Sequence, residues 1–155
     1  MRFATLGFAF VVLMLGASSC GGDDDPDARF DITLAQGDSQ ATVSVEVAAT
    51  FRERQQGLML RQEMAEDAGM LFLFPRDGQV GFWMKDTYLP LDIAYISAAG
   101  EVLEVRQATP LDETALTPAQ PYRYALEVNQ GWFERHALGA GAKVTLPTGL
   151  PKPTE

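Results

Sequence analysis

The chain has 155 residues, a formal net charge of −9 and one cysteine. A single cysteine excludes an intrachain disulfide, and a strongly negative chain repels phosphate backbones, so we expect no nucleic-acid partner. The length fits one ordinary domain built around one core.

Residues 1–19 have the pattern of a secretory signal peptide. Arg2 supplies a positive charge, and residues 3–15 form an apolar run that is too short to span a bilayer. Small residues then precede Cys20, which resembles the lipobox of bacterial lipoproteins, where the cysteine becomes lipidated. Ordinary cleavage nearby, leaving a free thiol, is the alternative. The lipidated form predicts an exported protein at the cell envelope, anchored in the membrane through Cys20.

Three further regions follow Cys20. Residues 20–29, "CGGDDDPDAR", cannot bury apolar surface and favour a flexible acidic tether. Residues 30–147 carry the folding patterns described next and predict a single β-domain. Residues 148–155, "TGLPKPTE" without the preceding strand pattern, predict a loose C-terminal tail.

Period-two alternation marks the first strands of this domain. Residues 30–35 and 41–49 alternate apolar and polar side chains, which is typical of half-buried strands. Thr50 with Glu53 forms a capping-box pattern, and it predicts a short helix over 51–56 that Gly57 ends.

The rest of the domain reads as short strands separated by turns. The pair Asp77-Gly78 predicts a hairpin between strands at 70–74 and 80–84. Further strands are expected at 91–97, 101–107, 122–128 and 143–147, with one or two helical turns within 129–141. In the strand 122–128, Glu127 is expected on the polar face. About seven short strands and one or two short helices predict an all-β fold, a compact antiparallel barrel or sandwich.

Four ordered blocks carry a family resemblance: "RQQGLMLR" (54–61), "GMLFLF" (69–74), "FWMKDTYLPLDIAYI" (82–96) and "ALEVNQGWFERHALGAGAKV" (125–144). They are similar to the signature blocks of the family known as domain of unknown function 192, and they span about residues 41–146. The resemblance implies an all-β, barrel- or sandwich-like fold of bacterial and archaeal proteins, often exported or lipidated. It implies no reaction. Asp86 stands where the family usually has asparagine.

The candidate site centres on the block at 82–96. Trp83 offers a flat apolar floor, and Lys85, Asp86 and Thr87 add polar groups beside it. Asp92 falls on an apolar strand face, where a carboxylate needs a partner. The nearest candidates are Lys85, Thr87, the amides of 86–89, and Arg61. The alternative is that Trp83 is core and that Asp92 pairs with Lys85 only to fix the loop.

These residues predict a non-catalytic module that binds a small molecule or an envelope protein. Two alternatives stay open: an envelope hydrolase using Asp86 and Asp92 as paired carboxylates, and a purely structural interaction lipoprotein. No motif for a nucleophile, a nucleotide, a cofactor or a metal appears, so none of these is expected.

Overall fold

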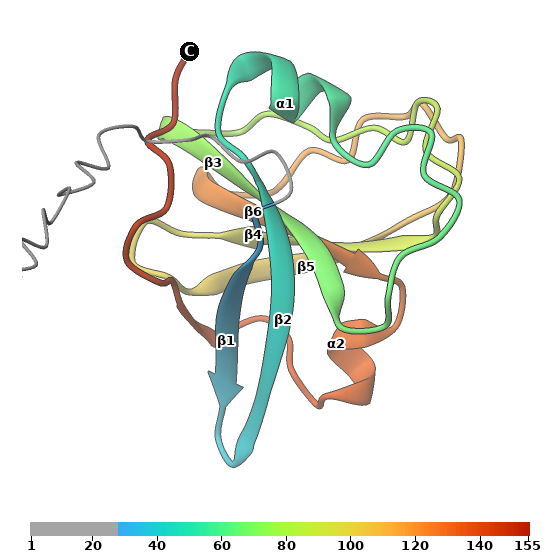
Figure 1. Ribbon diagram of the computed structural model, residues 1–155. Helices are drawn as coiled ribbons and strands as arrows, with labels where there is room; N and C mark the ends of the chain where they lie inside the picture. The colour runs from blue at the N-terminus through green and yellow to red at the C-terminus, as the bar shows by residue number, and fades with distance from the viewer. Residues whose placement is uncertain (1–27) are drawn as a thin grey trace, which may run out of the picture.

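The fold is described from a computed structural model, shown in Figure 1. The structure describes residues 28–155, so the predicted signal peptide, Cys20 and the tether as far as residue 27 lie outside the described residues. One sheet of seven strands and two short helices make up the described part, which confirms the all-β prediction. No helix among residues 28–155 is long and apolar enough to cross a membrane.

Apart from the strand expected at 80–84, the elements follow one another in the order predicted. They are β1 (Phe30–Gln36), β2 (Ser39–Ala48), α1 (Phe51–Gln56), β3 (Ala68–Gly78), β4 (Leu91–Ile96), β5 (Val102–Ala108), β6 (Tyr122–Asn129), α2 (Trp132–Arg135) and β7 (Lys143–Thr145). In the sheet the strands lie in the order β5-β4-β6-β3-β2-β1-β7. The pair β2–β3 is parallel, in contrast to the purely antiparallel sheet predicted, because the chain crosses over through α1 between them.

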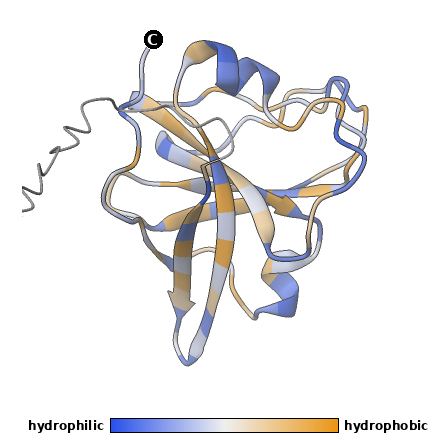
Figure 2. Cartoon of the chain, viewed as in Figure 1, coloured by the Kyte–Doolittle hydropathy of each residue, from blue (hydrophilic) through white to orange (hydrophobic). Residues whose placement is uncertain are grey.

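The sheet curls until its two ends approach each other. The amide of Val102, at the start of β5, donates to the carbonyl of Ala142, just before β7, at 2.9 Å. A bridge between Glu101 and Lys143 continues this contact. The curl leaves the sheet with an inner and an outer face, and side chains alternate between them along each strand, as the bands on β2 in Figure 2 show.

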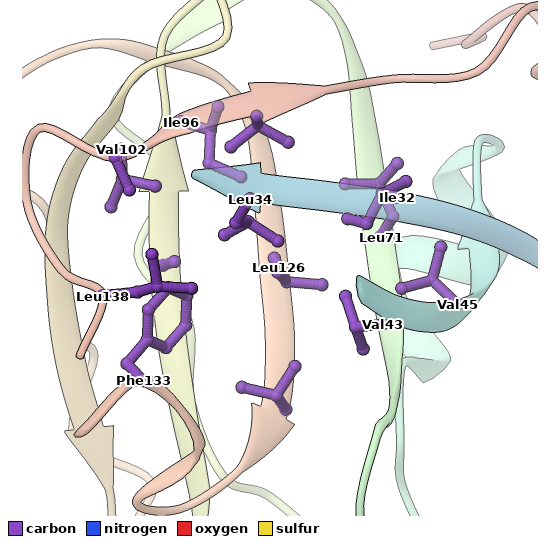
Figure 3. Close-up of a cluster of buried hydrophobic side chains, with 14 of the residues drawn as sticks. Ile32, Leu34, Val43, Val45, Leu71, Ile96, Val102, Leu126, Phe133 and Leu138 are labelled. Atoms are coloured by element: carbon purple, nitrogen blue, oxygen red, sulfur yellow. The ribbon is translucent and has the colours of Figure 1, made fainter. Parts of the chain in front are cut away.

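The inner face holds the larger hydrophobic core, here called the inner core. It draws buried side chains from all seven strands, and α2 closes it with Trp132 and Phe133. Figure 3 shows Leu34 and Leu126 pointing into this space. Strand pleating therefore directs every second residue of a strand toward the inner core.

The outer face carries a second core, here called the outer core, on the strands β2 to β6. Phe72, Tyr95 and Tyr122 belong to it, and Phe82 packs edge-on against Phe72 at 5.0 Å between ring centroids. The helix α1 and three long loops (57–67, 79–90 and 109–121) cover this face. The predicted capping box is present: the Glu53 amide donates to Thr50 Oγ1 at 3.3 Å.

Two local predictions differ from the structure. Residues 80–84 form no strand; β3 extends to Gly78 beside β6, and the loop that follows contributes a single isolated β-bridge, between Phe82 and Leu116. The tail at 148–155, expected to be loose, is held to the domain, since the Thr154 amide donates to the Ala49 carbonyl at 3.0 Å. In both cases the deciding contact joins segments far apart in sequence.

Candidate functional site

Two buried tyrosines hold the loops over the outer core. Tyr95 donates its hydroxyl to the carbonyl of Leu116, and Tyr122 donates to that of Val80 at 2.8 Å. Burial raises the pKa of both hydroxyls, so both stay neutral donors at physiological pH. The loops 79–90 and 109–121 are therefore fixed to the sheet and act as parts of a rigid surface.

Backbone hydrogen bonds join the three loops to one another. The amide of Leu60 donates to the carbonyl of Asp86 at 2.8 Å, and the amide of Leu111 donates to that of Thr87 at 3.1 Å. The amide of Met84 donates to the carbonyl of Asp112 at 2.8 Å. In Figure 1 the chain segments after α1, after β3 and before β6 run together on the right of the view.

Three residues at these junctions adopt a left-handed backbone. The φ angles are 65° at Leu60, 51° at Asp86 and 62° at Leu111. Aspartate and asparagine tolerate this conformation, which gives a backbone reason for either residue at position 86. Leucine does not favour it, and such strain persists only where surrounding contacts impose it, often at functional sites.

Large apolar side chains project from the same loops into solvent. We call Leu60, Trp83, Tyr88 and Leu111 the loop face; their exposed fractions are 68%, 43%, 43% and 54%. Lys85 Nζ lies 5.5 Å from the centroid of the Trp83 ring, a cation–π contact. Beneath them, Met84, Thr87 and Leu89 are buried. The segment 83–89 thus presents some side chains to solvent and anchors itself with the others.

The structure brings four of the six predicted ligand-binding residues together. Trp83, Lys85, Asp86 and Thr87 share the loop 79–90. Thr87 is buried, and its hydroxyl donates to the carbonyl of Lys85 at 3.1 Å, so it shapes the turn. The polar groups that reach solvent here are those of Lys85 and Asp86.

Arg61 follows Leu60 in the sequence, but its side chain forms an ion pair away from the loop face. Its guanidinium forms a two-point ion pair with Glu46 on β2, and Arg29 binds the same carboxylate at 2.6 Å. The hydrogen bond from Arg61 holds the pKa of Glu46 below its usual range. This ion pair stands between two open grooves of about 880 and 740 Å³, both of which Arg61 lines.

Asp92 lies away from the loop face. Its strand β4 directs Leu91 and Ile93 to the outer core, so Asp92 points the other way and is 2% exposed. Its Oδ2 accepts from the amide of Gly131 at the start of α2, at 3.0 Å. Burial raises the pKa of Asp92, and the amides of Phe133 and Gly131 oppose that rise. The partners expected for Asp92 were Lys85, Thr87, Arg61 and the amides of 86–89, whereas the backbone amides at the start of α2 take that role.

The hydrolase alternative required Asp86 and Asp92 to act as a pair. Asp86 is exposed on a loop over the outer core, whereas Asp92 is buried on the inner side of β4. The structure therefore does not bring these two carboxylates together. Among residues 28–155, no three His, Cys, Asp or Glu side chains gather in an arrangement that could hold a metal ion.

One acid, Glu127, lies on the strand face expected for it, but that face is buried and not exposed to solvent. Glu127 was expected among the polar residues of its strand, yet it is 5% exposed and points into the outer core between Met70 of β3 and Ile93 of β4. Burial raises the pKa of Glu127 to about 8. A strand covered on both faces explains the error, because its polar-looking side is also buried.

Comparison with known proteins agrees with this architecture. A protein from Sinorhizobium meliloti 1021, described as a "putative transcription regulator", is 34% identical, with a TM-score of 0.73 over 77% of this chain and 94% of its own. A protein of unknown function from Novosphingobium aromaticivorans DSM 12444 is 32% identical, with a TM-score of 0.72 over 76% of this chain and 84% of its own. No curated protein matches. The model of the DUF192 family, described as "Uncharacterized ACR", matches residues 32–146, and the chain belongs to this family.

Proposed function

We propose that this protein is a non-catalytic lipoprotein module of the cell envelope that docks another protein through its loop face. The observation that carries the proposal is the exposure of four large apolar side chains on three loops that are locked together. Large apolar side chains exposed on adjoining loops are typical of interaction sites. Aromatic residues such as Trp83 and Tyr88 are the side chains that most often dominate binding energy at such sites.

A protein partner suits this surface better than a small ligand. Small molecules bind in concave pockets, whereas none of the loop-face residues lines the grooves of about 880 and 740 Å³ beside Arg61. The acids Asp86, Asp112 and Glu113 lie on the same loops and are exposed, against one exposed cation, Lys85. We therefore expect a partner segment that pairs apolar anchors with basic residues.

A role in transcription, as the description of the Sinorhizobium protein names, does not suit this chain. Its net charge of −9 repels DNA phosphates, and direct DNA contact requires basic patches. An envelope partner agrees better with the predicted signal peptide and Cys20, which would place the domain outside the cytoplasm.

Cross-linking in intact cells tests the docking surface. A photoreactive residue at Trp83 or at Tyr88 is expected to capture the same protein, through a segment containing basic residues. The same probe at Asp38, which is exposed in the β1–β2 turn, is the matched control and should capture nothing comparable. Adding Leu111→Asp should lower the cross-link yield from position 83 at least about tenfold, because docking would bury a carboxylate within an apolar contact.

Other cross-linking outcomes contradict the docking proposal. Equal yields from positions 38 and 83 would mean contact without a specific face. Capture that persists unchanged with Leu111→Asp would show that the apolar patch does not contribute to binding. A captured segment rich in acids would contradict the expected charge pairing.

The lipid anchor has its own test. We expect Cys20→Ser to abolish incorporation of labelled palmitate and to move the protein from the membrane fraction to the soluble envelope fraction. The thiol is the acyl acceptor, and serine cannot replace it. Ser19→Ala keeps the cysteine and should leave both results unchanged. A wild-type protein that takes up no palmitate would instead favour ordinary cleavage.

A further inference from the structure

Glu127 lies at a position where three elements meet. Its strand neighbours across the sheet are Met70 on β3 and Ile93 on β4. From above, the chain at the end of α1 covers it: Glu127 Oε2 is 3.9 Å from the point that a Cβ atom at Gly57 would occupy. Leu58, which follows Gly57, is 2% exposed in the same core.

No side chain around this carboxylate satisfies it. None of the hydrogen bonds or ion pairs in the described part of the chain involves it, and burial alone accounts for its raised pKa. The charged residues level with Glu127 across the sheet lie on the next strands but one. Glu46 on β2 pairs across from Met70 and is bound by Arg61, and Arg106 on β5 pairs across from Ile93.

The neighbouring polar side chain on the same face of β6 is also engaged. Asn129 donates its amide to the carbonyl of Ala65 at 2.8 Å. The neighbours identified around Glu127 are thus methionine, isoleucine, leucine and glycine, and no donor within residues 28–155 forms a hydrogen bond with its carboxylate. A buried acid without a partner is rare in native structures and calls for a specific explanation.

The carboxylate is buried without being sealed. Glu127 keeps 5% of its surface exposed. Within residues 28–155, Oδ1 of Asp92 is the side-chain oxygen or nitrogen that has neither accessible surface nor a hydrogen-bond partner. The oxygens of Glu127 also lack a partner, but they differ from Asp92 Oδ1 because they keep some accessible surface. A probe the size of water therefore touches the Glu127 oxygens, although the exposed area is small.

We propose that Glu127 anchors a second binding site, separate from the loop face, which accepts a primary ammonium group at the end of a slender alkyl arm. The ammonium group supplies the hydrogen-bond donors that the surrounding elements lack. Methylene groups suit the apolar surroundings made by Met70, Ile93 and Leu58. A lysine side chain or a free alkylamine has this chemistry.

The free energy needed to ionise Glu127 reduces the affinity for an ammonium group only modestly. The pKa of Glu127 is about 8, one unit above neutral pH, so forming the carboxylate at pH 7 weakens binding about tenfold. A charge-assisted hydrogen bond at a buried position outweighs that factor. Ligand binding must then displace the proton of Glu127, which makes the interaction measurable on the carboxyl group itself.

The experiment follows the carboxyl carbon of Glu127 by NMR in protein labelled at glutamate side chains. In the free protein it is expected to titrate near pH 8. Saturating n-butylamine should lower that midpoint by at least one pH unit, whereas n-butanol, which has the same arm without the charge, should leave it unchanged. The assignment of the signal comes from its loss in Glu127→Gln.

A thermal measurement complements the titration. At pH 7, n-butylamine should raise the melting temperature of the wild-type protein, and Glu127→Gln should remove this increase, since the amide carries no charge to pair. An unchanged carboxyl midpoint in saturating amine overturns the proposal. An equal thermal effect of the amine on Glu127→Gln also overturns it. Neither result bears on the loop face, which the cross-linking tests separately.

Discussion

Gly69→Ala is expected to destabilise the domain by about 3 kcal/mol and to lower its melting temperature by at least about 10 °C. A Cβ atom at position 69 would lie 2.4 Å from the backbone carbonyl oxygen of Glu127 and 3.0 Å from Val128 Cγ1. A carbonyl within a β-ladder cannot move aside as a flexible side chain can. The strands β3 and β6, at the centre of the sheet, would have to separate.

Thermal and urea unfolding followed by circular dichroism measure this effect. The same strand offers a matched control, because a Cβ atom at Gly78 would meet nothing within 4 Å. Gly78→Ala should change the free energy of unfolding by less than about 1 kcal/mol, because the added methyl group meets no atom and only restricts the unfolded chain. Equal effects at the two glycines would show that β3 and β6 lie further apart at position 69 than described.

Much of the fold could be predicted from the sequence because the signals are local. The alternation in β2 and the capping box of Thr50 and Glu53 depend on neighbouring residues, and both appear in the structure. The predicted hairpin at Asp77-Gly78 failed for a long-range reason. After an irregular stretch beyond Leu73, β3 pairs with β6 again at Gly78, opposite Tyr122, and this long-range pairing has no signal in the local sequence.

The candidate site was predictable only in part, for the same physical reason. Trp83, Lys85 and Asp86 are close in sequence, so their shared position on one loop follows from the chain itself. Leu60 and Leu111 join them through backbone hydrogen bonds to Asp86 and Thr87, which side-chain patterns do not encode. Their exposure and left-handed backbone emerge only in the folded domain.

The stability of the wild-type protein is expected to fall as the pH rises from about 5.5 to 8, by about 3 kcal/mol more than that of Glu127→Gln. Burial raises the pKa of Glu127 from 4.5 to about 8. Below pH 4.5 both the folded and the unfolded chain hold this proton, so its contribution is complete there. Between the two pKa values the unfolded chain releases the proton and the folded chain keeps it, so each pH unit costs about 1.4 kcal/mol.

Urea unfolding at a series of pH values, compared between the two proteins, isolates this contribution. Asp92, whose pKa is also raised, and every other titrating group are common to both proteins and cancel in the difference. Glutamine has the shape of the neutral acid but does not titrate. The free energy of unfolding of Glu127→Gln therefore lacks the additional decrease with pH that Glu127 causes in the wild-type protein. Parallel curves would mean that the folded protein already holds Glu127 as a carboxylate. That result requires a donor near Met70 and Ile93, and it would remove the reason for an incoming ammonium group to bind there.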